Sequence, residues 1–348
     1  MKKITLFFSF FFFGMSFSFS QYPVNLFAEY FENENYTGFR DIEEALKTPN
    51  EVYLLDLEDQ GLTQIPKEVF LFPNLKGLNL KYNDLTSIPD SIRLLKNLKV
   101  LSFAFNSINT IPNSIASLTN LEYISFENNG ITKLPESFSK LTRLKSISFD
   151  NCDLKEIPLW FQNFKELEEL ILSENKINSL PNIFSSIPKL KRLELSGAQL
   201  TSLPSSFVNL SELSVLNLSK NLFTEFPKQI CGLKNLVVLN ISENQLKKLD
   251  DCFCQLSKIQ FLNLAENELL ALPIKLGLLS QLISLDVTQN QLKELPSSLE
   301  ELTEIESLKA YSNQLTKTPT FPKAKVYVGL EIDEEFPLEY EPVENDKD

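Results

Sequence analysis

The sequence contains no histidine and only nine glycines among its 348 residues. The absence of histidine removes the usual general base, the usual proton shuttle and the commonest zinc ligand. The chain also has no glycine-rich loop of the kind that holds phosphates. Basic residues are in deficit, with 33 Lys and Arg against 46 Asp and Glu, which gives a net charge of −13. This excess of negative charge disfavours nucleic acids and anionic membranes as partners.

Long apolar runs are missing except at the start of the chain, where Ile4–Phe13 follows Lys2 and Lys3. This run is too short to span a bilayer as a helix. Ser18, Phe19 and Ser20 then form a small-x-small sequence before Gln21. We interpret residues 1–20 as a bacterial-type secretory signal peptide, with a buried N-terminal helix as the alternative. The mature chain is therefore expected to be exported to the periplasm, cell surface or medium, without membrane insertion.

A repeat of 23 residues fills most of the remaining chain, and Leu75–Asn97 shows it clearly. The same pattern returns without insertion or deletion in twelve copies. The opening positions are Val52, Leu75, Leu98, Leu121, Leu144, Leu167, Leu190, Leu213, Leu236, Ile259, Leu282 and Ile305. A fixed period of this length indicates a stacked repeat architecture.

Within each repeat, L-x-x-L-x-L predicts a short strand with one buried face. Equivalent strands recur in the same orientation, so we expect a parallel sheet with strands about 4.8 Å apart. A proline such as Pro89 or Pro112 then ends the descending side in every repeat except the ninth, which has Asp250. The return leg has an apolar spacing of three, which favours a short 3₁₀ turn over a long helix.

The ninth position of the repeat is asparagine in nine copies. These residues are Asn83, Asn106, Asn129, Asn175, Asn221, Asn244, Asn267, Asn290 and Asn313. A buried amide side chain offers donors and an acceptor to backbone groups that no strand ladder satisfies. We therefore expect a structural asparagine ladder, interrupted at Gln60, Cys152 and Ala198.

The combined pattern L-x-x-L-x-L-x-x-N-x-L-x-x-L-P-x-x-I-x-x-L resembles the 23-residue class of leucine-rich repeat proteins, including secreted bacterial members. The resemblance implies an α/β-type solenoid, a horseshoe with a parallel concave β-sheet and short 3₁₀ turns on its convex side. It also implies that the concave sheet binds another macromolecule, most often a protein. Fold alone does not identify that partner.

The segments outside the repeats have their own expected roles. Residues 21–51 are predicted to cap the first repeat, with a helix at Asp41–Lys47 that turns Ile42, Ala45 and Leu46 inward. Residues 52–330 hold the repeats and a closing edge strand at Lys325–Leu330. Residues 331–348 are strongly acidic, and we expect a flexible tail there, with secretion or attachment as an alternative role.

Two of the four cysteines, Cys231 and Cys254, occupy the same position in successive repeats. We expect them to lie within disulfide range, and an exported protein favours such a bridge. Cys252 could compete for Cys231, and reduced thiols are the remaining alternative. Cys152 is expected to be buried and structural.

The expected binding surface combines an aromatic and aliphatic cluster with a polar rim in repeats two to five. Its residues are Tyr82, Val100, Phe105 and Tyr123, with Glu127, Asp150 and Asn151 beside them. Grouped exposed aromatics are typical of interface anchors. The alternative is that Tyr82 and Phe105 only cover the neighbouring turn.

Other chemistry finds weaker support in the sequence. Glu169, Glu174 and Glu194 could imitate a glycosidase acid pair, but acidic residues on an open face are usually solvated. Glu127, Asn128, Asp150 and Asn151 could supply oxygen ligands to calcium, although no tight loop is evident. We therefore predict a non-enzymatic protein without cofactor or metal that binds a protein or glycan of a cell surface or envelope. The alternative is a structural surface protein or adhesin without a single defined site.

Overall fold

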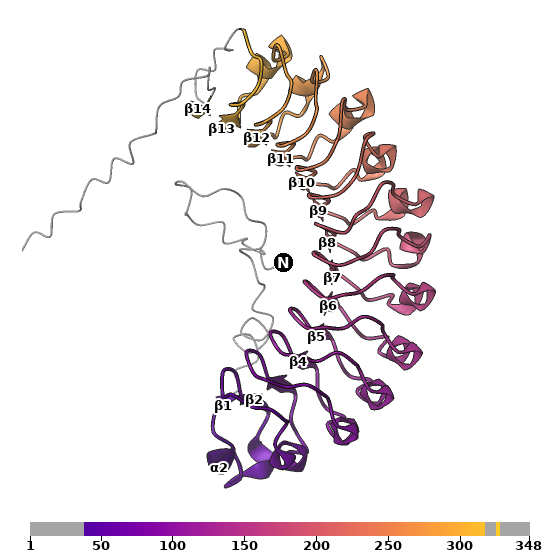
Figure 1. The fold of residues 1–348 in the computed structure, drawn as a ribbon, viewed down its shortest axis with the longest axis vertical. Coiled ribbons are helices and arrows are strands. Elements are labelled where there is room, and N and C mark those ends of the chain that lie inside the picture. Colours follow the sequence, from indigo (N-terminus) through magenta and orange to yellow (C-terminus); the bar gives the residue numbers. More distant parts are fainter. Residues whose placement is uncertain (1–37, 317–324, 328–348) are drawn as a thin grey trace, which may run out of the picture. The chain divides into compact units, whose positions relative to one another are not determined.

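The computed structural model describes residues 38–316 and 325–327. The predicted signal peptide, the first part of the cap and the acidic tail lie outside the described residues. The chain divides into two compact units, residues 1–152 and 153–348. Figure 1 shows that each unit is a stack of similar coils.

The first unit contains a parallel sheet in the order β1-β2-β3-β4-β5-β6. Its strands are β1 (Gly38–Phe39), β2 (Leu54–Asp56), β3 (Gly77–Asn79), β4 (Val100–Ser102), β5 (Tyr123–Ser125) and β6 (Ser146–Ser148). Its helical segments are α2 (Ile42–Ala45) and the 3₁₀ turns η2 (Pro49–Glu51), η3 (Lys67–Leu71), η4 (Asp90–Leu94), η5 (Asn113–Ser117) and η6 (Glu136–Lys140).

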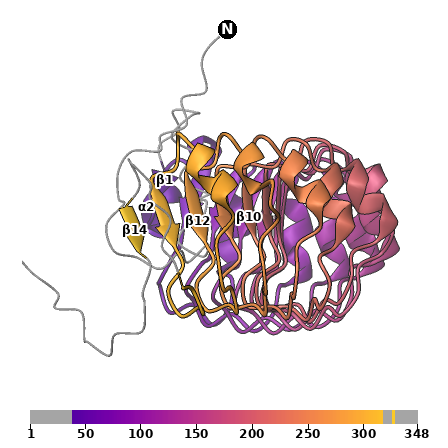
Figure 2. The same ribbon diagram turned by 90° about the horizontal axis from the view of Figure 1, so that it is seen from above.

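The second unit continues the same plan with strands β7 to β14. These are β7 (Glu169–Ile171), β8 (Arg192–Glu194), β9 (Val215–Asn217), β10 (Val238–Asn240), β11 (Phe261–Asn263), β12 (Ser284–Asp286), β13 (Ser307–Lys309) and β14 (Lys325–Tyr327). The 3₁₀ turns are η7 (Leu159–Asn163), η8 (Phe184–Ser186), η9 (Ser205–Asn209), η10 (Lys228–Gly232), η11 (Asp251–Gln255), η12 (Leu276–Leu278) and η13 (Ser297–Glu301). In Figure 2, β10 and β12 run in the same direction within this stack.

The predicted leucine-rich repeat solenoid is confirmed in its sheet and in its turns. From β2 to β6 and from β7 to β13, strand partners lie 23 positions apart, as in Leu78↔Leu101, so the sequence period is also the sheet register. In each unit the strands lie on the inner side of the curve and the 3₁₀ turns on the outer side (Figure 1). Pro89 and Pro112 stand at the N-caps of η4 and η5 with φ of −73° and −72°, because the proline ring fixes this angle and prevents strand continuation.

The core lies between the sheet and the 3₁₀ turns. Leu78, Leu101 and Ile124 are almost fully buried in register. Phe103, Phe126 and Phe149 stack along the first unit with ring centroids 5.3 Å apart. Burying one such side chain stabilises the folded state by roughly 1.5–3 kcal/mol. This stack of phenylalanines forms only when neighbouring repeats pack against each other.

The cap adds a strand that the sequence pattern did not predict, because β1 pairs in parallel with β2. Helix α2 follows it, and the carboxylate of Asp41 accepts a hydrogen bond from the Glu44 backbone N–H at 2.8 Å. Ala45 is fully buried as expected, whereas Leu46 is 37% exposed and does not face inward. The helix ends at Ala45, so Leu46 does not lie on its buried side.

At the other end, β14 lies within the expected closing segment and pairs with β13. The described helical segments are all short. Within residues 38–316 and 325–327, none is long and apolar enough to cross a membrane.

Candidate binding surface

The asparagine ladder connects each repeat to the repeat before it. Asn244 is representative: its Nδ2 donates to the carbonyl oxygens of Leu218, Ile241 and Ser242 at 3.0, 3.2 and 2.9 Å. Its Oδ1 accepts from the backbone N–H of Phe223 at 3.1 Å. The other eight asparagines of this column donate and accept in the same manner. This ladder fixes the loops at the C-terminal ends of the strands.

The three exceptions in the column replace these bonds incompletely. The Gln60 side-chain amide donates to the carbonyl oxygen of Arg40 in the cap at 2.8 Å. The Cys152 thiol donates to the carbonyl oxygen of Phe126 at 3.3 Å. Ala198 is fully buried and its methyl group can make no hydrogen bond. The repeat around Ala198 therefore lacks the side-chain bonds made in its neighbours.

The residue before each member of this column has a positive φ, and we call these residues the left-handed row. In the first unit they are Asp59, Tyr82, Phe105, Asn128 and Asn151; in the second they are Glu174, Gly197, Lys220, Glu243, Glu266, Gln289 and Ser312. Glycine and asparagine adopt this conformation readily, but bulky side chains do so at a cost. The φ angles of Tyr82 and Phe105 are 53° and 55°, so both aromatics occupy positions better suited to glycine or asparagine.

Tyr82 and Phe105 form a ring pair at this edge of the sheet. Their centroids are 4.4 Å apart with a tilt of 32°, and Tyr82 is 45% exposed. The Lys81 Nζ lies 4.6 Å from the Tyr82 centroid and 5.2 Å from the Phe105 centroid. Such cation–π contacts hold the rings in place while leaving ring surface accessible. The sequence prediction missed Lys81, although its place directly before Tyr82 was a usable signal.

The polar rim continues from this ring pair into the next repeats. Burial raises the pKa of the Glu127 carboxyl, and the charge of Lys81 opposes that rise. The Asn128 amide donates to Glu127 at 3.4 Å, and the Asn151 amide donates to Asn128. Asp150 lies beside them, half-buried, and its backbone carbonyl accepts from the N–H of Asn128 at 2.8 Å. The structure therefore places the ring pair and the polar rim in successive repeats along one edge of the sheet, and the Phe105 N–H donates to the Glu127 carbonyl oxygen at 2.7 Å.

Val100 and Tyr123 lie elsewhere than predicted. They are register partners at the first positions of β4 and β5, at the opposite end of the strands from Phe105. Val100 is only 2% exposed and cannot itself serve as a contact residue. On its face of the sheet, Val100 lies between Gly77 of β3 and the larger Tyr123 of β5. Its exposure therefore depends on these cross-strand neighbours as well as on its place in the repeat. Tyr123 remains half-buried at the sheet surface.

Glu194, one of the acids considered for a glycosidase-like pair, is not open to solvent. Glu194 is 4% exposed and its Oε1 lies 2.9 Å from the Arg192 guanidinium. Burial raises the pKa of the Glu194 carboxyl, whereas the Arg192 charge opposes the rise. Glu169 is the register partner of Arg192, not of Glu194. In the part of the chain that the structure describes, no group of three or more Cys, Asp or Glu could hold a metal ion.

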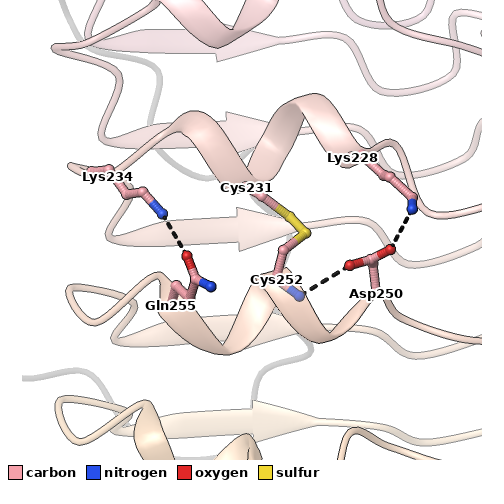
Figure 3. The surroundings of a disulfide bond; sticks show 6 residues. All are labelled: Lys228, Cys231, Lys234, Asp250, Cys252 and Gln255. Atoms are coloured by element: carbon pink, nitrogen blue, oxygen red, sulfur yellow. Dashed lines mark hydrogen bonds and ion pairs between the residues drawn. A yellow bond between two sulfur atoms is a disulfide. The ribbon is translucent and has the colours of Figure 1, made fainter.

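The structure joins Cys231 to Cys252, so the expected Cys231–Cys254 bridge is not formed. The Cα atoms of the bonded pair are 5.7 Å apart, and the two side chains point toward each other from η10 and η11 (Figure 3). Side chains at equivalent positions of stacked turns point in the same direction and do not converge, whereas a disulfide needs Cβ atoms roughly 3.5–4.5 Å apart. Cys254 is instead buried as a free thiol, and burial raises its pKa.

The same two turns are also held together by polar contacts. Asp250, which replaces the usual proline, accepts from the backbone N–H of Cys252 at 3.0 Å and pairs with Lys228 at 2.8 Å (Figure 3). The hydrogen bond from Lys228 lowers the pKa of the Asp250 carboxyl. The Lys234 ammonium donates to the Gln255 side chain at 3.5 Å.

Comparisons with known proteins agree with this geometry. A family model described as leucine rich repeat matches residues 50–108, 158–200 and 227–269, and a model for two copies of the repeat matches residues 96–142. No curated protein matches the chain.

Several solved structures are similar to the chain. An LRR protein of Leptospira interrogans, LIC12759, is 27% identical over 80% of this chain and 95% of its own, with a TM-score of 0.49. The Arabidopsis receptor kinase HAESA, solved with the peptide hormone IDA and the co-receptor SERK1, is 26% identical over 75% of this chain, with a TM-score of 0.67. The match covers 46% of the HAESA chain. An internalin of Listeria monocytogenes is 22% identical over 74% of this chain and 80% of its own, with a TM-score of 0.62.

Proposed function

The chain belongs to the leucine-rich repeat family, and from that premise we propose that it is an exported protein that binds a partner protein through the inner face of its first unit. The contact residues are Tyr82 and Phe105, with Glu127, Asp150 and Asn151 as the polar rim. Tyr123 extends the surface toward the start of the strands. The proposal assigns the chain no catalytic role.

The observation that carries the proposal is the placement of two bulky rings in the left-handed row. A non-glycine residue in this conformation costs of order 1–3 kcal/mol. The ring pair and its lysine recover roughly 0.5–1.5 kcal/mol and 0.5–1 kcal/mol, respectively. Folding therefore gains little or nothing from aromatic residues here, while an exposed Tyr82 and a half-buried Phe105 beside hydrogen-bonding groups suit an interface anchor. HAESA, whose structure includes a peptide hormone and a co-receptor, supports a protein as the partner class.

The experiment compares capture of surface proteins by the wild-type chain and by the Phe105→Asn and Tyr82→Asn variants. Asparagine tolerates positive φ, so both variants should keep their thermal stability within about 1 kcal/mol of the wild type. Tyr311→Ala is the matched control, since Tyr311 is 43% exposed but lies in the second unit. Loss of the same captured protein in both asparagine variants, but not in the control, is the expected result. Unchanged capture in all variants would favour the alternative of a structural surface protein or adhesin.

Export is tested separately from binding. The full-length chain expressed in a bacterium should be recovered outside the cytoplasm with Gln21 as its first residue. N-terminal sequencing and mass spectrometry measure this directly, and Lys2→Glu/Lys3→Glu should reduce export by removing the positive start of the signal. Recovery of an uncleaved cytoplasmic chain would refute this part of the proposal.

A further inference from the structure

The carboxylates beside the ring pair lack the ion pairs that hold other carboxylates of the chain. Lys191 shows the common arrangement, because its ammonium pairs at 2.7 Å with Glu168, which lies 23 residues earlier. Within residues 38–316 and 325–327, by contrast, none of Glu58, Asp59 and Glu127 forms an ion pair with a lysine or arginine. Their charges are therefore available to a cation from outside the chain.

These carboxylates stand on both sides of the ring pair along one edge of the sheet. Asp59 precedes Tyr82 by one repeat in the left-handed row, and its N–H donates to the Lys81 carbonyl oxygen at 3.0 Å. Glu127 lies in the repeat after Phe105, whose N–H donates to the Glu127 carbonyl oxygen at 2.7 Å. Asp59 is exposed and Glu127 is half-buried. Backbone bonds between successive repeats thus fix the order acid, ring, ring, acid.

The edge carries an excess of negative charge. Glu58, Asp59 and Glu127 share it with one ammonium group, that of Lys81, which lies over the two rings. Burial raises the pKa of the Glu127 carboxyl although the Lys81 charge opposes the rise, so Lys81 compensates the Glu127 charge only in part. Arg40 acts on Glu58 but already pairs with another carboxylate at 2.7 Å. This edge therefore attracts a basic segment and repels an acidic one.

The spacing of these groups sets the pattern of a segment that fits. Asp59 and Glu127 lie in repeats one and four, which places them three strand spacings, or about 14 Å, apart. An extended chain advances about 3.3–3.6 Å per residue, so its residues i and i+4 span about the same distance. Residues i, i+2 and i+4 of such a chain point to one side. When the side chains at i and i+4 reach the acids, the one at i+2 lies over the ring pair.

We propose that the partner docks on this edge through an extended basic segment with arginines at positions i and i+4 and an apolar residue at i+2. This inference rests on the protein-binding surface proposed above and states the chemistry of its partner. One arginine pairs with Glu58 and Asp59, and the other pairs with Glu127. The apolar side chain between them packs on Tyr82 and Phe105. Arginine suits these places better than lysine, because its planar guanidinium presents five donors to carboxylate oxygens.

The test measures binding of three labelled heptapeptides to the chain by fluorescence anisotropy. The first probe, Gly-Arg-Ser-Leu-Ser-Arg-Gly, has the proposed pattern. The second probe, Gly-Arg-Ser-Leu-Arg-Ser-Gly, has the same composition, but its arginines point to opposite sides of an extended chain. The third probe carries glutamate in place of both arginines. We expect the first probe to bind about fivefold more tightly than the second, and the third not to bind.

Variants of the chain locate the binding. Asp59→Asn/Glu127→Gln should weaken binding of the first probe by about fivefold or more, because both side chains keep their size and lose their charge. Glu243→Gln/Glu266→Gln is the matched control, since both glutamates are exposed members of the left-handed row in the second unit. Melting temperatures verify that each variant is folded. Equal affinity for the first two probes, binding of the glutamate probe, or an equal loss in the control would overturn the proposal.

The capture experiment separates this inference from the protein-binding surface itself. We expect Tyr82→Asn, Phe105→Asn and Asp59→Asn/Glu127→Gln all to lose the same captured protein. If the two ring variants lose it and Asp59→Asn/Glu127→Gln retains it, the surface stands and the basic segment is wrong. If the ring variants also retain it, the proposed surface is wrong, and the basic segment is wrong with it.

Discussion

Asn244 lies in the second unit, at the C-terminal ends of the strands, the edge that carries the Tyr82–Phe105 pair in the first unit. Replacing Asn244 by alanine tests how the asparagine ladder holds the repeats together. In the native structure this side chain makes four hydrogen bonds, all to backbone groups. The three carbonyl oxygens that it contacts each have a second donor: Asn221 on Leu218, Asn267 on Ile241 and the Lys220 N–H on Ser242. The N–H of Phe223 is different, because the Asn244 oxygen is the acceptor that it uses.

The magnitude follows from this difference. An unsatisfied buried N–H costs about 1–3 kcal/mol, and the three lost bonds to carbonyls that keep another donor contribute less than their usual 0.5–1.5 kcal/mol each. We therefore expect Asn244→Ala to lower the free energy of unfolding by about 3 kcal/mol. Asn244→Asp should not restore this loss, because its second oxygen would face the carbonyl oxygens of Leu218, Ile241 and Ser242 without a proton to share, and the buried charge adds a further cost.

Urea unfolding followed by Trp160 fluorescence measures the effect, since Trp160 packs on Phe161 and Phe164 in the same unit. Hydrogen exchange at the Phe223 amide should become faster in Asn244→Ala. Exposed Asn178 provides the control, and Asn178→Ala should change stability by less than about 0.5 kcal/mol. A loss below about 1 kcal/mol together with unchanged exchange at Phe223 would refute the role given to the asparagine ladder.

Three further predictions concern other parts of the chain. Ala198→Asn should raise the unfolding free energy by about 1 kcal/mol in urea, because it supplies the missing side-chain bonds; a loss of stability would mean that the repeat has no room for the amide. Cys252→Ser should lower it by about 3 kcal/mol by opening the bridge to Cys231, whereas peptide mapping that finds no such bridge would contradict the structure. Glu127→Gln should stabilise the chain at neutral pH but not in acid, with exposed Glu136→Gln as the control. Burial raises the folded-state pKa of Glu127, so its contribution is most favourable below the unfolded pKa and is lost as pH rises through the folded value; equal effects at both pH values would refute this.

The period of 23 residues predicted the fold because it carries over directly into the sheet. Leu78, Leu101 and Ile124 occupy equivalent places in the sequence and become register partners in β3, β4 and β5. No insertion interrupts the count, so strand direction and register follow from the sequence alone. The prolines before the return legs likewise predicted where most of the 3₁₀ turns begin, as Pro89 does at η4, although Asp250 is the N-cap of η11 instead.

Features that depend on direction within a turn could not be read from the period. A 3₁₀ turn has 3.0 residues per turn, so Cys252 and Cys254 point to different sides although only one residue separates them. Equivalent position therefore suggested Cys254 as the partner of Cys231, and geometry selects Cys252. The exposure of a side chain could not be predicted from the period either. Val100 is buried because of its neighbours in β3 and β5 and not because of its position in the repeat.

The proposed binding surface departs from the repeat at positions where stacking of the repeats does not require an aromatic side chain. The left-handed row accepts asparagine at Asn128 and glycine at Gly197 without bulk, so the rings of Tyr82 and Phe105 are local choices that stacking the repeats does not require. Because the solenoid forms with small or bulky side chains in this row, binding of a ligand can determine which residues stand there.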